Sequence, residues 1–516
     1  MKLLNLRERK IFMSEYKNNH KYRMSGILAH PTSLPSPYGI GDMGKGAYDF
    51  VDFLVNSGQT LWQILPLGPT GYGDSPYQSF SAFAGQPLII SPELLKEDGL
   101  LSDDDLKDVP TWYSDKIDYG YVIYYKTNLF KKAFTNFKTV MNDHPDIAKS
   151  YSTFLSENSF WLKDYALYMS VKDSYGGASW LSWDECHKDI KPSDYDSVCD
   201  KYSDAMDYYF FIQFEFCYQW QKLKKYANER GIYIVGDIPI FVSMDSADAW
   251  SNKKYFKLDS KGFPTAVSGV PPDYFSATGQ LWGNPLYDWD ALKADNYSWW
   301  IHRIRHQLDL VDYLRIDHFR GFEAYWSVPY GEETAINGQW IKGPCEDFFQ
   351  NLQQIFGDNL PIFAEDLGII TPEVEALRDG FGLPGMKILQ FAFDSGNDSS
   401  FMPHHYTRNS ICYTGTHDND TTRGWYDSLS DYAKERLKLY INSDCSDVCW
   451  DLIRVALAST SRYAIIPITD ILSVDTSGRM NMPGRPSGNW QWRFKDGALT
   501  DAVSDKLRTY TQLYSR

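Results

Sequence analysis

The stretch VDYLRID, residues 311–317, shows the feature that decides the fold of this chain. Val311–Ile316 is a short, largely apolar run, and a charged residue, Asp317, follows it directly. Runs this short suit strands that are buried on both faces of a parallel sheet. Seven other runs of this kind are Ser25–Leu28, Thr60–Leu67, Ile232–Val235, Leu360–Ala364, Met386–Phe393, Ile411–Thr414 and Ala464–Ile468.

Helical segments separate most of these eight runs. One of them begins at Thr371-Pro372, which supplies an N-cap residue and a proline at the first helical position. The predicted helices are Gly46–Asn56, Phe211–Arg230, Trp299–Leu310, Cys345–Phe356, Thr371–Asp379, Asp431–Asn442, Val448–Arg462 and Ala498–Ser515. Strands that alternate with helices in this way predict an α/β fold, a (β/α)8 TIM barrel. Only Asp394–Ser410, after the sixth strand, shows no clear helix.

Two segments are too long to be ordinary connections between a strand and the next helix. Residues from about 92 to 205 are rich in Tyr, Ser, Asp and Lys, and we interpret them as an inserted, largely helical subdomain. Residues from about 243 to 298 contain Gly, Pro and aromatic residues, and they are predicted to form a long loop region after the third strand. We therefore expect one barrel over residues 24–516, preceded by a loose tail at residues 1–23.

The overall charge of the chain excludes some classes of partner. The 516 residues include 51 Lys and Arg against 67 Asp and Glu, which gives a net charge of −16. An acidic surface repels phosphate groups, so we expect neither nucleic acid nor a membrane as partner. Aromatic residues make up 16% of the chain, and they could stack on sugar rings; a large, Tyr-rich core is the simpler reading of composition alone.

Seven cysteines are scattered along the chain without a CxxC pair. Such a set is typical of free thiols in a reducing compartment. The first residues show no signal peptide, and no apolar run is long enough to span a membrane, so the sequence predicts a cytoplasmic protein. No phosphate-binding loop, dinucleotide fingerprint or metal-ligand cluster is visible, so we expect no cofactor and no metal.

Carboxylates follow four of the predicted strands, at the barrel end where active sites lie. A single Asp in such a place is more often a helix cap or turn former, and Arg315 with Asp317 could be a structural ion pair. Clustering several carboxylates with an Arg and a His on one rim costs folding free energy, so such a set indicates a function. Two carboxylates are the minimum for glycoside cleavage. The four strand ends are GDIP (236–239), RIDH (315–318), EDLG (365–368) and THDN (416–419).

Longer motifs around these residues carry a family resemblance. From about Gly26 to the C-terminus, the chain resembles the amylomaltase, or 4-α-glucanotransferase, family: glycoside hydrolase family 77 of the α-amylase clan. One departure is Gln86, where the family leads us to expect Asn. The motifs are GDSPYQSFSAFAG (73–85), GVPPDYFSATGQLWGNP (269–285), RIDHFRG (315–321), AEDLG (364–368), YTGTHDN (413–419) and RMNMPG (479–484).

The resemblance implies a role for each matching residue. Asp317 corresponds to the nucleophile, Glu365 to the general acid/base and Asp418 to a third carboxylate that grips sugar hydroxyls. The residues implied to bind substrate, three of them on a loop that overhangs the cleft, are Tyr77, Asp237, Tyr274, Phe275, Trp282, Arg315, Asp394 and His417. The resemblance therefore implies that the predicted barrel is the catalytic domain.

The implied reaction is a retaining transfer of α-1,4-glucan segments to glucose or a maltooligosaccharide, through a covalent glycosyl-aspartate. The alternative within the same clan is a hydrolase that uses the same residues with water as acceptor. A non-catalytic glycan-binding protein would keep the aromatic residues but lose a carboxylate, and all three carboxylates are present.

Overall fold

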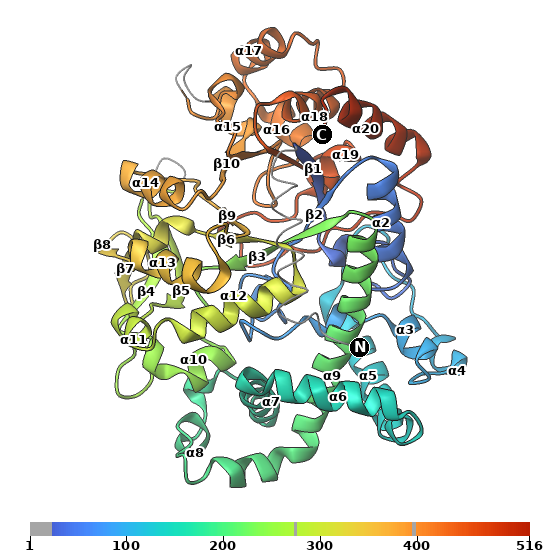
Figure 1. The fold of residues 1–516 in the computed structure, drawn as a ribbon, viewed down its shortest axis with the longest axis vertical. Helices are drawn as coiled ribbons and strands as arrows, with labels where there is room; N and C mark the ends of the chain where they lie inside the picture. Colours follow the sequence, from blue (N-terminus) through green and yellow to red (C-terminus); the bar gives the residue numbers. More distant parts are fainter. Residues whose placement is uncertain (1–22, 273–275, 395–398) are drawn as a thin grey trace.

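A closed barrel of eight parallel strands forms the centre of the molecule (Figure 1). The computed structural model describes residues 23–516 except 273–275, 395–398 and the side chains of Tyr72 and Asp394. The strands, in their order around the barrel, are β1 (Met24–Leu28), β12 (Tyr463–Pro467), β11 (Ser410–Tyr413), β10 (Gly385–Ile388), β9 (Ile362–Ala364), β6 (Tyr313–Asp317), β3 (Tyr233–Pro239) and β2 (Leu61–Gln63). Each overlaps one of the eight predicted runs, so the predicted barrel is confirmed.

Strand residues alternate between two hydrophobic clusters, which explains why the runs are apolar throughout. One set fills the barrel interior and includes Val235, Tyr313 and Phe363. The other set, which includes Ile234 and Leu314, packs under the surrounding helices. Side chains two residues apart share a face of a strand. The polar residues at the strand ends that keep this spacing therefore face the barrel interior as well.

Helices cover the barrel where the sequence predicts them. They are α2 (Lys45–Asn56), α9 (Tyr195–Glu229), α12 (Ser298–Leu310), α13 (Cys345–Phe356), α14 (Pro372–Gly380), α17 (Asp431–Ile441), α18 (Val448–Ala458) and α20 (Asp501–Leu513). A further helix, α16 (Thr422–Ser428), was not predicted. Two boundaries were clearly wrong: α9 begins at Tyr195 instead of Phe211, and β10 ends at Ile388, so that α15 (Leu389–Asp394) takes up the rest of the predicted sixth strand. A short apolar run does not distinguish a strand from the first turn of a buried helix.

The segment from 92 to 205 contains a group of helices at the lower end of Figure 1. They are α3 (Pro92–Glu97), α4 (Asp103–Leu106), α5 (Tyr119–Asp143), α6 (Pro145–Glu157), α7 (Ser159–Ser174) and α8 (Glu185–Lys188). Helix α9 then runs across residue 205, so no break in secondary structure marks the expected boundary. The buried Lys126 of α5 donates hydrogen bonds to the carbonyls of Leu88 and Ile90, which ties these helices to the barrel loops.

A second, antiparallel sheet lies beside the barrel and was not predicted from the sequence. Its order is β5-β4-β7-β8, from β4 (Ala266–Val270), β5 (Gln280–Pro285), β7 (Ala324–Pro329) and β8 (Gln339–Lys342). The predicted loop region 243–298 supplies β4 and β5, together with α10 (Ala247–Ser251) and α11 (Trp289–Ala294). The other two strands of this sheet, β7 and β8, follow β6 in the chain, so the sheet joins segments that are far apart in sequence.

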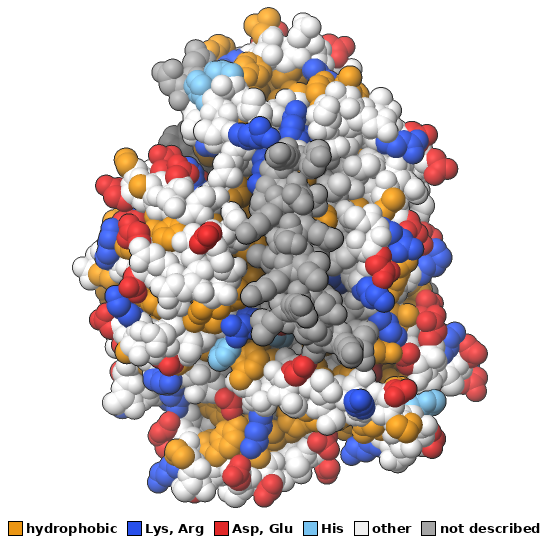
Figure 2. Space-filling view, viewed as in Figure 1, with side chains coloured by type: hydrophobic (Ala, Val, Ile, Leu, Met, Phe, Trp, Pro, Cys, Tyr) orange, Lys and Arg blue, Asp and Glu red, His pale blue; other side chains and the backbone are white. Residues whose placement is uncertain are grey.

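Three further features bear on the surroundings of the protein: its surface charges, its cysteines and the polarity of its helices. Figure 2 shows acidic and basic side chains interspersed over the face in view. All seven cysteines are free thiols. In the described part of the chain, the helices are too short or too polar to cross a membrane.

Candidate active site

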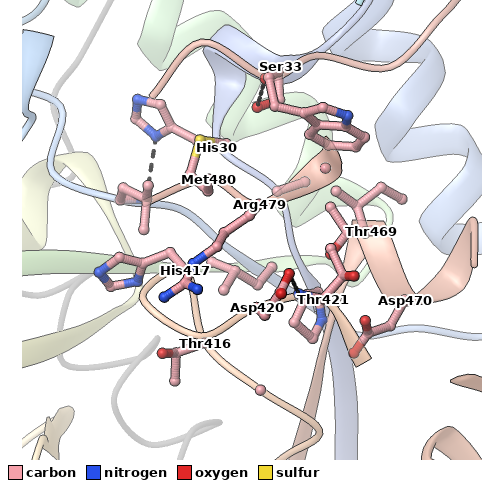
Figure 3. Close-up of a pocket in the computed structure, with 18 residues that line it drawn as sticks. His30, Ser33, Thr416, His417, Asp420, Thr421, Thr469, Asp470, Arg479 and Met480 are labelled. Carbon is pink, nitrogen blue, oxygen red and sulfur yellow. Dashed lines mark hydrogen bonds between the residues drawn. The ribbon is translucent and has the colours of Figure 1, made fainter. Parts of the chain in front are cut away.

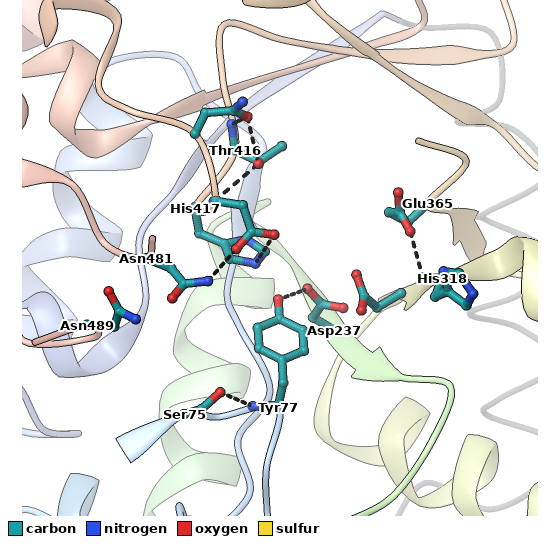
Figure 4. A network of polar contacts seen from close by, with 12 residues as sticks. Ser75, Tyr77, Asp237, His318, Glu365, Thr416, His417, Asn481 and Asn489 are labelled. Atoms are coloured by element: carbon teal, nitrogen blue, oxygen red, sulfur yellow. Dashed lines mark hydrogen bonds and ion pairs between the residues drawn. The ribbon is translucent and has the colours of Figure 1, made fainter. Parts of the chain in front are cut away.

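Polar side chains converge at the C-terminal ends of four barrel strands (Figure 4). Interior-facing Val235, Tyr313 and Phe363 are each followed two residues later by a charged residue: Asp237, Arg315 and Glu365. Asp317 continues the series on β6, and His417 and Asp418 follow β11. The strand period therefore places these groups on the inner side of one rim.

Arg315 joins two of the carboxylates. Its Nη1 lies 2.5 Å from Oδ2 of Asp237, and its Nη2 lies 2.8 Å from Oδ1 of Asp317. Burial disfavours the charge of the guanidinium, but Asp237 and Asp317 outweigh that effect and hold the Arg315 pKa well above its usual value. Arg315 is thus a permanent cation that keeps one oxygen of Asp317 in place, while 29% of the Asp317 side chain stays exposed.

Glu365 has a different environment, although it belongs to the neighbouring strand of the barrel. Its Oε2 accepts a 2.7 Å hydrogen bond from the backbone N–H of His318, and its Oε1 accepts a 2.8 Å bond from that of Leu367. Burial and, secondarily, the charge of Asp317 raise the pKa of Glu365 to about 8. At neutral pH one carboxylate is paired with a cation and its neighbour is protonated, the contrast that acid/base catalysis needs.

Asp418 stands at the opposite side of the rim and is held by residues from the RMNMPG motif. Asn481 Nδ2 donates to Oδ1 of Asp418 at 2.6 Å, and Arg479 Nη2 donates to its backbone carbonyl at 2.9 Å. His417 Nε2 lies 3.4 Å from Oδ2. The Asp418 side chain remains 45% exposed, so its carboxylate is fixed and still accessible.

Tyr77 connects the two sides of the rim, as Figure 4 shows. Its hydroxyl donates a 2.8 Å hydrogen bond to Oδ2 of Asp237. Its ring stacks on that of His417, with centroids 5.2 Å apart and planes 16° from parallel, and Trp490 packs beside both. The other oxygen of Asp237, Oδ1, is buried and has no hydrogen-bond partner among the described residues.

A small pocket lies against His417 and continues the rim (Figure 3). His30, Thr416, Asp420 and Arg479 are among its lining residues. Burial and, secondarily, the nearby His417 lower the pKa of His30 to about 3, and its Nδ1 accepts a hydrogen bond from the Leu65 backbone at 3.2 Å. Neutral His30 therefore braces the strand ends behind His417.

Most of the residues singled out from the sequence therefore meet at this rim. Trp282 of β5 lies at its edge and contacts His318, with ring centroids 4.7 Å apart at 88°. Tyr274 and Phe275 lie outside the described residues, as does the side chain of Asp394. The residues brought together on the rim are Tyr77, Asp237, Arg315, Asp317, Glu365, His417 and Asp418.

Sequence reasoning missed three residues of the site. His318 and Asn481 lie inside the quoted motifs RIDHFRG and RMNMPG, so the motifs pointed to their positions but not to their contacts. Trp490 had no signal, because a single tryptophan near the C-terminus resembles any core residue. Within the residues that the structure describes, no group of three or more His, Cys, Asp or Glu side chains is arranged to hold a metal ion.

Comparison with known proteins identifies the family. The sequence model of the family described as 4-alpha-glucanotransferase matches residues 29–500. A 4-alpha-glucanotransferase of Synechocystis is 49% identical, over 96% of this chain and 98% of the relative. One from Thermus thermophilus is 45% identical, over 96% and 99%. The amylomaltase of Streptococcus agalactiae, solved in complex with acarbose, has a TM-score of 0.92 and 39% identity, over 96% and 99%. The resemblance read from the motifs is thus confirmed, and the chain belongs to the 4-α-glucanotransferase family.

Proposed function

We propose that this chain, a glycosyl-transferring enzyme of that family, transfers α-1,4-glucan segments by double displacement on Asp317. The contrast between Asp317 and Glu365 is the observation that carries the proposal. Asp317 is paired with the permanent cation Arg315, whereas burial keeps Glu365 protonated. A retaining mechanism needs one carboxylate of each kind, about 5–5.5 Å apart.

In the first step the free oxygen of Asp317 attacks the anomeric carbon of the donor sugar. Glu365 gives its proton to the glycosidic oxygen, so that the leaving chain departs with a new 4-hydroxyl and a glycosyl ester remains on Asp317. In the second step an acceptor 4-hydroxyl attacks the same anomeric carbon, its bond to Asp317 breaks to release the carboxylate, and Glu365 takes up the proton of the hydroxyl. Both residues return to their starting states, and the anomeric configuration is retained.

The remaining rim residues are proposed to hold the donor sugar. Asp418 is fixed and half-exposed, which suits a carboxylate that binds sugar hydroxyls. Asp237 Oδ1, buried without a partner among the described residues, is available for a further hydroxyl. Tyr77 offers an aromatic face to the ring of the donor sugar, and Arg315 and His417 hold the residues around it. Asp394 is included because of the family resemblance.

The acceptor decides between a transferase and a hydrolase. Water attacks the ester unless a sugar is held in place and water is kept out, and positioning contributes about 7–11 kcal/mol to lowering the barrier. We assign the acceptor side to the aromatic residues Tyr274, Phe275 and Trp282, with glucose or a maltooligosaccharide as acceptor. Trp282 supports this assignment because it contacts His318, the residue next to Asp317. The seven free thiols support the proposed cytoplasmic location.

Incubation with maltotriose tests the proposal. We expect a ladder of shorter and longer maltooligosaccharides with almost no net rise in reducing ends. Asp317→Asn removes the nucleophile and should abolish most of this redistribution. With α-maltosyl fluoride as donor, the Glu365→Gln variant should accumulate a maltosyl adduct on the peptide that contains Asp317, visible by mass spectrometry. If reducing ends rise in step with turnover, the enzyme is a hydrolase; an adduct on another residue would refute the assignment of the nucleophile.

A further inference from the structure

His318, directly after Asp317, has a backbone conformation that side chains rarely adopt. Its φ of 55° and ψ of 48° lie in the left-handed region. Non-glycine residues in this region are uncommon, although Asn, Asp and His enter it more readily than others. Such conformations persist where the surrounding structure enforces them, and they concentrate at functional sites. The strain therefore lies beside the proposed nucleophile.

The consequence of this turn is a set of hydrogen bonds to Glu365. The Glu365 N–H donates to the carbonyl of Ile316 at 3.1 Å, and the Phe319 N–H donates to the carbonyl of Glu365 at 3.0 Å. Between them, the His318 N–H donates to the side-chain Oε2 of Glu365 at 2.7 Å. Residues on both sides of Asp317 are thus bonded to Glu365, and of these three bonds the one from His318 ends on the carboxyl group, whose other oxygen accepts from Leu367.

We propose that His318 is a positioning residue: its left-handed turn aims its backbone N–H at Glu365 and so sets the acid/base relative to Asp317. The proposal rests on the proposed function and extends it: retention requires the two carboxyl groups to be about 5–5.5 Å apart, and the His318 bond is what we expect to fix Glu365 relative to Asp317. In a straight strand the His318 N–H would face the same neighbouring strand, as the N–H of Leu314 does, and would meet the backbone carbonyl of Glu365. The turn gives that carbonyl to the N–H of Phe319 and leaves the N–H of His318 for the carboxyl group.

The imidazole of His318 serves the turn by packing. Trp282 lies edge-on to it, and Gly321 lies close on another side, where an added Cβ would come within 3.2 Å of the ring carbon Cδ2. Nε2 is buried and reaches no hydrogen-bond partner within the described residues. Burial and the charge of Arg320 lower the pKa of His318 to about 3, so the ring is neutral. The function of this residue therefore lies in its backbone.

The His318 bond also bears on the proton that Glu365 carries. The charged side chains that shift Glu365 are Asp317, which raises its pKa, and Arg315, which lowers it; both belong to β6. The N–H groups of His318 and Leu367 stabilise the carboxylate form and so oppose the effect of burial. Loss of the His318 bond should therefore raise the Glu365 pKa further and make the acid a poorer proton donor.

Variants at residue 318 separate the backbone from the ring. His318→Asn and His318→Gly both lose the imidazole but tolerate the left-handed region, whereas His318→Val opposes it with a side chain of similar size to Asn. We expect the Asn and Gly variants to keep kcat/KM on maltotriose within about threefold of the wild type. The Val variant should lose about 10–100-fold, the effect of one hydrogen bond to a group that becomes charged as it gives up its proton.

Two readouts distinguish positioning from a general loss of structure. First, the alkaline limb of kcat/KM should move to higher pH in the Val variant and stay in place in the Asn variant. Second, the Val variant should lose less with α-maltosyl fluoride than with maltotriose, because fluoride leaves without a proton. If the His318→Val variant does not fold, the His318→Ala variant takes its place, and its kcat/KM should be lower than that of His318→Asn.

The outcomes that overturn each idea are different. Equal losses in the Asn and Val variants, with the same alkaline limb, would show that the imidazole matters and the turn does not, which refutes this proposal. An alkaline limb that persists in Glu365→Gln would refute the acid/base assignment itself, whatever the variants at residue 318 do.

Discussion

At the scale of single residues, Glu365 shows how environment assigns a role to a carboxyl group. Its pKa is raised to about 8 by burial and then by Asp317, so this proposed general acid is protonated below that pH. We expect kcat/KM on maltotriose to fall as the pH rises through about 8. Glu365→Gln cannot donate a proton and should lower the rate about 10²–10⁴-fold. A pH profile of both proteins checks this prediction, which fails if the mutant keeps the same alkaline limb.

The same raised pKa has a consequence for stability. The folded protein binds more protons at Glu365 than the unfolded chain between pH 4.5 and about 8. The contribution of Glu365 to stability is therefore fully present below pH 4.5 and decreases as the pH rises through this window. Relative to Glu365→Gln, the wild type should lose up to about 5 kcal/mol of unfolding free energy between pH 4.5 and 8. Urea unfolding of both proteins at the two pH values measures the difference. A constant difference would mean that Glu365 is ionised at neutral pH.

Asp418 allows catalysis to be separated from folding. Its side chain is 45% exposed, so Asp418→Asn should change the unfolding free energy by no more than about 0.5 kcal/mol. Activity should nevertheless fall by about 10²-fold or more, because the charge that faces the sugar is removed. Urea unfolding and the maltotriose assay on one preparation give both numbers. Near-wild-type activity would remove Asp418 from the site.

At the scale of elements, the barrel closes through strands that approach closely at glycine. Gly26 of β1 pairs with Leu61 of β2, and a Cβ at Gly26 would lie 2.3 Å from the Leu61 carbonyl oxygen. Gly26→Ala should therefore destabilise the protein by about 3 kcal/mol, the cost of an overpacked core. Gly380, at the end of α14, is the matched control, since a Cβ there meets nothing within 4 Å and alanine favours the helix. Thermal unfolding of the two variants should move in opposite directions; a neutral Gly26→Ala would show that β1 and β2 can separate at little cost.

At the scale of the whole molecule, the antiparallel sheet brings Trp282 to the edge of the barrel rim. If Trp282 helps to hold the acceptor and exclude water, Trp282→Ala should raise the ratio of hydrolysis to transfer on maltotriose severalfold. Leu281→Ala is the matched control, because Leu281 is the neighbouring residue of β5, points to the other face and is 36% exposed. Reducing-end and product assays report the ratio. An unchanged ratio in Trp282→Ala would assign the exclusion of water to another part of the molecule.

The amino-acid sequence by itself determined the barrel and the identity of the rim residues. Eight apolar runs with intervening helices predict the barrel because strands buried on both faces have a local signature. Asp237, Arg315, Asp317, Glu365, His417 and Asp418 were recognisable because each stands where such a run ends, and the motifs added Tyr77.

Only the tertiary structure decided how these residues differ from one another. The sheet β5-β4-β7-β8 escaped prediction because its pairing joins strands on either side of β6, and hydrogen bonds between distant segments leave no periodicity in either one. Likewise, Glu365 and Asp317 are both ordinary carboxylates in the sequence. Burial and the charge of Asp317 raise the pKa of Glu365, the N–H of His318 opposes that shift, and the guanidinium of Arg315 pairs with Asp317. These are effects of three-dimensional proximity that no local pattern encodes.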